Sequence, residues 1–246
     1  MSTPLRLAVW SGPRNISTAM MRAWENREDC TVVDEPFYAH YLLETRLPHP
    51  GRDEVLRAGE LDWRKVVEGL LGPVPGDHAI WYQKHMTHHM LPHIARGFMH
   101  SLVNVFLIRD PREVIASYVR SRPDCVPTAK DVGVPQEAEL FAHVQAISGA
   151  APIVIDTGEF LRAPEAHLRA WCGQLGVDFS ERMLHWPEGP RESDGVWAPY
   201  WYDAVLHSTG FEPWHERDHS VPAEHAGIVA ECMPHYEALY EQRLRA

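Results

Sequence analysis

Residues 11–18 have side chains and a spacing suited to holding an anion. The segment reads Ser11-Gly12-Pro13-Arg14-Asn15-Ile16-Ser17-Thr18 and lies between a short apolar run and a helical pattern. At such a junction, successive backbone N–H groups gather at the helix N-terminus and attract phosphate or sulfate. Arg14 adds a positive charge, and Ser17 and Thr18 add hydroxyl donors. The lysine and second glycine of a Walker A loop are missing, and an ordinary strand–helix turn capped by serine stays open as the alternative.

A second candidate anion site follows a later apolar run. Arg109 stands directly after the run 103–108, and Ser117 comes eight residues further on. Eight residues are about two helical turns, so both side chains can reach one phosphate if a helix begins near Pro111. The alternative is that Arg109 forms a surface ion pair with Asp110 or Glu113, which is a common and weak interaction.

A group of histidines offers a different kind of chemistry. His85, His88, His89 and His93 include pairs three and four residues apart. If this segment were helical, such pairs would share a face and could hold Zn²⁺. The segment 85–93 contains no HExxH motif, and the 16 histidines of the chain make chance clusters common, so zinc is kept only as a competing interpretation.

These residues need a scaffold, and the apolar runs predict one. Near-continuous apolar runs are typical of strands covered on both faces, and five are found at residues 5–10, 31–33, 79–83, 103–108 and 152–155. Helical patterns fall between them at 17–25, 111–120, 136–148 and 164–175, the last followed by a capping glycine, Gly176. This alternation predicts a three-layer α/β/α fold with a central parallel sheet of about five strands. Such sheets bind ligands beyond the carboxyl ends of their strands, which places Lys84 and the residues after it beyond the third strand.

The remaining segments are interpreted as elaborations of a single domain spanning residues 1–246. We expect a core at about 5–177 and a surface insertion at about 48–76 with one helix at 63–71. An irregular cap is expected at about 186–216 and a C-terminal helix at about 223–243.

The two anion-binding segments together resemble the cofactor signature of sulfotransferases that use 3′-phosphoadenosine 5′-phosphosulfate (PAPS). Residues 13–19 are similar to the PKSGTTW-like loop that holds the 5′-phosphosulfate in that family, with Arg14 in place of the lysine and Ser17 and Thr18 as the hydroxyls. Arg109 and Ser117 match the spacing of the family's 3′-phosphate motif. A third similarity, to a PExxL helix that ends in LG, extends the resemblance to about residue 177.

The sequence also departs from the family pattern. Ile16 stands where the loop has glycine, so we expect different backbone angles in that turn. The RKGxxG segment that closes over the cofactor is missing, and Arg191 within the stretch 189–197 is the candidate replacement. The resemblance therefore indicates a divergent, bacterial-type member with a P-loop nucleotide-hydrolase-like fold.

The resemblance also implies catalytic residues. Several branches of the family have a Glu-Pro dipeptide after the second strand, whose carboxylate deprotonates the acceptor, and Glu35 matches it. Burial beside Phe37 and Tyr38 would raise the pKa of Glu35, as suits a general base; a structural carboxylate that caps or forms an ion pair is the alternative. Lys84 corresponds to the lysine of the KTHLP motif, which contacts the transferring group. The histidine of that motif has two candidates here, His85 and His88.

The implied activity is transfer of a sulfuryl group from PAPS to a hydroxyl or amine of a small molecule, leaving adenosine 3′,5′-bisphosphate and requiring no metal. A net charge of −11 over 246 residues argues against nucleic-acid and anionic-membrane partners. With no long apolar run and no paired-cysteine motif, a cytoplasmic protein is expected, with a homodimer among the expectations. Another nucleotide-dependent transferase or kinase and a non-catalytic nucleotide-binding protein stay open.

Overall fold

The five predicted strands are present in the computed structural model, which describes residues 3–121, 127–216 and 220–246. They form one sheet with the order β2-β3-β1-β4-β5. Their bounds are β1 Leu5–Ser11, β2 Cys30–Asp34, β3 Ile80–Met86, β4 Val103–Ile108 and β5 Ile153–Asp156. The predicted α/β fold with a central parallel sheet between helical layers is confirmed.

The chain divides into two compact units, each with its own set of contacts. The first unit holds Met1–Val9, Ser17–Val103 and Ser180–Phe211, and the second holds Trp10–Ile16, Asn104–Phe179 and Glu212–Ala246. The predicted single domain, with its core, insertion and cap, stays a prediction.

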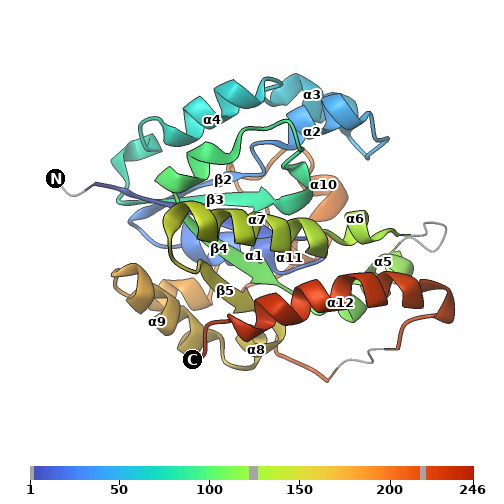
Figure 1. Cartoon of the computed structure of the whole chain (residues 1–246). Helices are drawn as coiled ribbons and strands as arrows, with labels where there is room; N and C mark the ends of the chain where they lie inside the picture. The colour runs from blue at the N-terminus through green and yellow to red at the C-terminus, as the bar shows by residue number, and fades with distance from the viewer. Residues whose placement is uncertain (1–2, 122–126, 217–219) are drawn as a thin grey trace. The chain divides into compact units, whose positions relative to one another are not determined.

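In the first unit, helices surround the paired strands β2 and β3 (Figure 1). Helix α1 (Ser17–Glu25) packs against both strands, and the Trp24 ring stacks on Tyr82 of β3 at a centroid distance of 6.0 Å. The other α-helices of this unit are α2 (Tyr38–Thr45), α3 (Arg52–Ala58), α4 (Trp63–Leu71), α10 (Ala198–Trp201) and α11 (Asp203–Leu206). Four 3₁₀ turns complete it: η1 (Pro75–Asp77), η2 (Thr87–His89), η3 (Arg96–Ser101) and η4 (Glu181–Leu184).

Two predictions about this unit were wrong. Helix α3 accompanies α4 in the stretch for which a single helix was expected. Strand β3 runs on to Met86, so Lys84 and His85 lie inside the strand and not beyond it. The predicted strand ended at residue 83 because Lys84 and His85, which follow, are polar. In the structure the polar residues of β3 have partners inside the protein: Gln83 Nε2 donates to the Leu70 carbonyl at 3.1 Å, and Lys84 pairs with carboxylates.

The second unit is built around the parallel pair β4 and β5. Its helices are α5 (Pro111–Ser121), α6 (Ala129–Val132), α7 (Val134–Ser148), α8 (Thr157–Arg162), α9 (Pro164–Leu175) and α12 (Ala226–Glu241), with the 3₁₀ turn η5 (Ala223–His225). Gly176 ends α9 with a φ of 69°, which confirms the predicted glycine cap. Helix α12 packs against α5, α6, α7 and β5.

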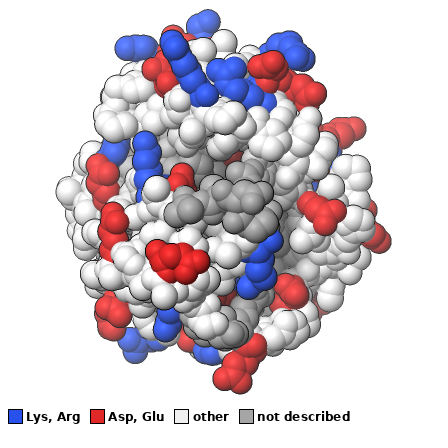
Figure 2. Space-filling view, turned by 90° about the vertical axis from the view of Figure 1, so that its right-hand side faces the viewer, with Lys and Arg blue, Asp and Glu red and all other residues white. Residues whose placement is uncertain are grey.

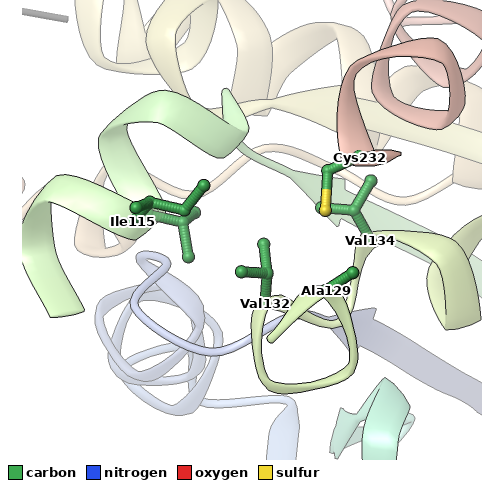
Figure 3. Packing of buried hydrophobic residues seen from close by; sticks show 6 residues of the cluster. Ile115, Ala129, Val132, Val134 and Cys232 are labelled. Carbon is green, nitrogen blue, oxygen red and sulfur yellow. The ribbon is translucent and has the colours of Figure 1, made fainter. Parts of the chain in front are cut away.

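A small apolar cluster joins four of these helices. Figure 3 shows Ile115 of α5, Ala129 and Val132 of α6, Val134 of α7 and Cys232 of α12 directed toward one another. The Cys232 side chain is fully buried, and burial raises the pKa of its thiol to about 11, so this cysteine behaves as a small apolar residue. Cys125, the fourth cysteine of the chain, lies outside the described residues.

The described surface is mixed in charge. On the face drawn in Figure 2, acidic and basic side chains are interspersed. Within the described ranges, no helix is both long and apolar enough to cross a bilayer. The compartment and the homodimer stay predictions.

Candidate active site

A buried polar network in the first unit contains two of the predicted catalytic residues. Lys84 Nζ donates to Asp34 Oδ1 at 2.8 Å, to Glu35 Oε1 at 2.6 Å and to the Tyr202 hydroxyl at 2.7 Å. The Tyr202 hydroxyl in turn donates to Asp34 Oδ2 at 2.6 Å. Each of these four side chains is at least nine-tenths buried. An ammonium group has three donors, and here all three are used inside the protein.

The strand register places these groups together. Asp34 is the last residue of β2 and lies opposite Lys84 in β3, so their side chains emerge on the same face of the sheet. Glu35 follows with a φ of 39°, in the left-handed region that non-glycine residues rarely adopt. Its backbone N–H donates to the Lys84 carbonyl at 3.0 Å, and its own carbonyl accepts from Tyr38 N at 2.9 Å. These two hydrogen bonds hold the turn that directs the Glu35 carboxyl onto Lys84.

Burial and charge act in opposite directions on this network. Burial raises the pKa of Glu35 above its ordinary value, the Lys84 ammonium opposes that rise, and the Asp34 carboxylate adds to it. For Lys84, burial lowers the pKa, but the Asp34 and Glu35 carboxylates outweigh burial, and the net pKa is raised. The expected rise in the pKa of Glu35 is therefore present, and Lys84 stays protonated.

The histidines predicted as bases lie in different surroundings. Because successive residues of a strand point to opposite faces, His85 is directed away from Lys84 and contacts the Phe37 ring at a centroid distance of 5.8 Å. Burial and then the Lys84 charge lower the pKa of His85 to about 3, which makes it a poor base at neutral pH. His88 lies in η2, and its ring is edge-on to the Tyr41 ring at a centroid distance of 5.2 Å.

The structure of the segment 85–93 does not support the zinc interpretation. His85 lies in β3, His88 and His89 lie in the 3₁₀ turn η2, and His93 follows in a turn, so the three- and four-residue spacings do not produce one helix face. In the described parts of the chain, no group of three or more His, Cys, Asp or Glu side chains could hold a metal ion. A neighbour of Glu35 that was considered only as a zinc ligand is His89, whose Nδ1 lies 4.0 Å from Glu35 Oε2.

The irregular segment near residue 200 contributes the unforeseen partner Tyr202. Trp197 Nε1 donates to the Tyr202 hydroxyl at 3.0 Å, and the backbone N–H of Gly195 donates to Asp34 Oδ2 at 3.2 Å. A side chain on Gly195 would not fit, because a Cβ there would lie 2.1 Å from the Trp197 ring. Tyr202 falls in the cap predicted at about 186–216, but only the fold shows that this tyrosine reaches the end of β2.

The second unit brings the predicted anion-binding residues together. Arg14 Nε donates to Ser117 Oγ at 3.0 Å, and Arg109 Nη1 donates to the Arg14 carbonyl at 2.8 Å. Arg109 also pairs with Glu113, Nη2 to Oε2 at 2.8 Å, which is the ion pair considered as the alternative. The side chain of Arg14 is exposed, and its terminal nitrogens have no partner among the described residues.

The turn from Gly12 to Ile16 is held by Asn15. Asn15 Nδ2 donates to the Leu107 carbonyl of β4 at 2.6 Å, and its Oδ1 accepts from Ile16 N at 2.8 Å and from the hydroxyl of Thr157. Because Ile16 replaces the glycine of the family's loop, different backbone angles were expected in this turn; its left-handed residue is Arg14, with a φ of 56°. The left-handed backbone of this turn therefore falls on the residue predicted to bind the anion.

A carboxyl group that the pattern did not identify lies under this turn. Glu137 of α7 is buried and hydrogen-bonds the backbone of Gly12; burial raises the pKa of Glu137 well above its ordinary value, and that hydrogen bond only partly offsets the rise. A Cβ on Gly12 would lie 2.9 Å from the Val132 carbonyl, so glycine permits this close approach.

Three further predicted residues belong to the first unit. Ser17 and Thr18 form the first turn of α1, and Ser17 is buried. Arg191, proposed to replace the closing segment of the family, has its Nε 3.8 Å from Glu25 Oε2, and its Nη2 donates to the Pro187 carbonyl at 3.0 Å.

The chain is similar to known proteins in sequence and in fold. Two relatives from Arabidopsis thaliana, branched-chain-amino-acid aminotransferase-like proteins 2 and 1, are 33% and 34% identical over 94% and 97% of this chain. The chain spans only about two fifths of their length, 40% and 42%. Among solved structures, the sulfotransferase domain of the Synechococcus PCC 7002 olefin synthase is similar with a TM-score of 0.61 at 16% identity, covering 99% of this chain and 96% of that one.

A sulfotransferase from Alicyclobacillus acidocaldarius has a TM-score of 0.58 at 14% identity, covering 99% of this chain and 98% of that one. At these identities the two structures show a shared fold. The model of a family described as "Sulfotransferase domain" matches residues 5–243, nearly the whole chain. The chain therefore belongs to the sulfotransferase domain family.

Proposed function

We propose that this protein transfers a sulfuryl group from PAPS to a hydroxyl or amine of a small-molecule acceptor, with Glu35 as the general base. The observation that carries the proposal is the buried Glu35 carboxyl, held by Lys84 at the end of β2, in a chain that matches a sulfotransferase domain over residues 5–243. The donor supplies the sulfuryl group, and adenosine 3′,5′-bisphosphate leaves as the acceptor atom bonds to sulfur.

The residues of the second unit suit a phosphorylated donor. Guanidinium groups bind phosphate with strong, charge-assisted hydrogen bonds, and Arg14 has terminal nitrogens available for them. The Ser117 hydroxyl lies beside Arg14, and Arg109 braces the carbonyl of the same residue. We assign Arg14 and Ser117, with Gly12, Pro13, Asn15, Ile16, Ser17, Thr18 and Arg109, to donor binding.

The residues of the first unit suit proton removal. Glu35 accepts the acceptor proton as the new bond to sulfur forms, and a raised pKa brings it closer to the pKa range in which a base is effective. Lys84 was expected to contact the transferring group. Its three donors are instead used by Asp34, Glu35 and Tyr202, so we assign Lys84 to holding the Glu35 carboxyl in place. The lowered pKa and the orientation of His85 favour Glu35 over this histidine as the base.

Ligand-induced thermal stabilisation tests the donor. Adenosine 3′,5′-bisphosphate at 100 times its Kd should stabilise the protein by about 2.7 kcal/mol, whereas ATP with Mg²⁺ should have little effect. Arg14→Ala should weaken bisphosphate binding about 10- to 100-fold, as loss of a charged hydrogen bond does, and Arg120→Ala, an exposed arginine at the end of α5, is the matched control.

The same titration separates the alternatives. Stabilisation by ATP with Mg²⁺ alone would indicate a kinase or another nucleotide-dependent transferase. Stabilisation by the bisphosphate without sulfate transfer from PAPS to any member of an acceptor panel would indicate a non-catalytic nucleotide-binding protein.

A further inference from the structure

A cavity of about 500 Å³ lies within the first unit, beside the edge strand β2. It extends from the end of β2, where it reaches Asp34 and Glu35, to helix α4 and to the segment 194–197. A volume of this size is typical of sites that enclose a small organic molecule. The cavity therefore has one end at the proposed base and its body between elements to which the proposed mechanism assigns no role.

The body of the cavity is apolar. Its walls include Val66 and Leu70 of α4, Trp81 of β3, and Val196 and Trp197. The apolar side chain of Val196 is 42% exposed, and a ligand bound in the cavity would cover it. Walls of this kind favour an aromatic or aliphatic body over a sugar or a peptide.

The charges around the cavity are mainly negative. Four of its lining residues are acidic and one, Lys65, is basic. Two of the acidic side chains form ion pairs, Asp34 with Lys84 and Asp194 with Arg22, the latter at 2.7 Å. Glu35 shares Lys84 with Asp34, and Glu60 and Lys65 are exposed. The lining thus has no surplus positive charge with which to bind an anionic molecule.

We propose that this cavity binds the acceptor, and that it selects a small molecule with an apolar body that is neutral or positively charged. The proposal rests on the proposed function, because Glu35 at the end of the cavity is the assigned base. The apolar walls hold the body of the acceptor, and its hydroxyl or amine meets the carboxyl end of β2. An acceptor carrying a carboxylate is disfavoured, because its charge would lie among lining residues of which four are acidic and one is basic.

Gly69 offers a way to fill the cavity without disturbing the fold. This exposed glycine of α4 lines the cavity, and a Cβ added to it would meet no atom within 4 Å. Gly69→Phe should therefore fold normally and place its ring in the space that the acceptor needs. Gly173→Phe is the matched control, because Gly173 is an exposed glycine of α9 in the second unit and its Cβ position is equally open.

Binding is measured by ligand-observed NMR on the whole protein with saturating adenosine 3′,5′-bisphosphate, so that the readout does not depend on turnover. Three phenols of similar size serve as probes: tyramine with an ammonium group, uncharged 4-ethylphenol, and 4-hydroxyphenylacetate with a carboxylate. We expect tyramine and 4-ethylphenol to bind at least tenfold more tightly than 4-hydroxyphenylacetate. Gly69→Phe should weaken binding of both at least tenfold with its melting temperature preserved, and Gly173→Phe should bind like the wild type.

Each contrary result has a distinct meaning. No binding of any probe, or equal binding by the wild type and Gly69→Phe, overturns the assignment of the cavity. Binding of 4-hydroxyphenylacetate as tight as that of tyramine overturns the charge selectivity. Binding that follows the expected pattern, with no sulfate transferred from PAPS to any bound phenol, contradicts the proposed function and leaves the cavity as a ligand site.

Discussion

The Lys84 ammonium donates a 2.6 Å hydrogen bond to Glu35 Oε1 while also holding Asp34 and Tyr202. One positive charge thus serves two adjacent carboxylates in a buried site. Two carboxylates that share one cation cannot both be fully neutralised, so burial still raises the pKa of Glu35. This relationship leaves Glu35 able to accept a proton and keeps its position fixed.

Replacing Glu35 with glutamine should remove the base while preserving the shape of the site. We expect turnover to fall about 100- to 10,000-fold, the range typical of a lost general base, with nearly unchanged affinity for adenosine 3′,5′-bisphosphate. In the wild type, turnover should rise with pH as Glu35 loses its proton, over a range above the ordinary value of about 4.3 because its pKa is raised. This rise should be missing from Glu35→Gln. Steady-state rates from PAPS between pH 5 and 8 measure both effects, and an equal loss of nucleotide affinity would refute the assigned role.

Replacing Lys84 with methionine should destabilise the protein strongly. The change leaves Asp34 and Glu35 buried without their cation, and breaking a buried ion pair in this way costs about 3–5 kcal/mol. Urea denaturation followed by circular dichroism measures the unfolding free energy. Lys130→Met, at an exposed position of α6, should change it by less than about 0.5 kcal/mol. A small effect of Lys84→Met would mean that the network contributes little to stability.

Replacing Glu137 with glutamine should change how stability depends on pH. Because the pKa of Glu137 is raised in the folded protein, the native state keeps a proton that the unfolded chain releases above about pH 4.3. The contribution of this group to stability therefore falls as pH rises from the unfolded value toward the folded one. The unfolding free energy of Glu137→Gln should therefore rise relative to that of the wild type, by up to about 1.4 kcal/mol for each pH unit in that window. Denaturation curves of the wild type and Glu137→Gln recorded between pH 4 and 8 measure this difference, and parallel curves would contradict the raised pKa of Glu137.

Replacing Gly195 with alanine should disturb the segment that reaches the end of β2. A Cβ would lie 2.1 Å from the Trp197 ring, so either the ring or the backbone must move, and overpacking of this kind costs about 1–3 kcal/mol. Gly173→Ala, in open space on α9, should instead stabilise by up to about 1 kcal/mol through helix propensity. The melting temperatures of the two variants are compared with that of the wild type. An unchanged melting temperature of Gly195→Ala would show that the Trp197 ring does not occupy the position seen in the structure.

Local pattern determined much of the scaffold. Strand β4 at 103–108 and helices α1 at 17–25 and α9 at 164–175 lie where apolar periodicity and Gly176 predict them, because these signals act between neighbouring residues. The candidate residue Arg14 was also identified from residue type and position, and Glu35 and Lys84 from the resemblance to the sulfotransferase family. Their roles remain predictions.

Partnerships between distant residues were decided only by the tertiary structure. Tyr202 reaches Lys84 across 118 positions, and Arg14 reaches Ser117 across 103. No local signal connects them, because such pairs depend on which strands become neighbours and on which face each side chain emerges. The same holds for the end of β3, whose polar residues are stable in a buried strand only because Asp34, Glu35 and the Leu70 carbonyl lie there to satisfy them.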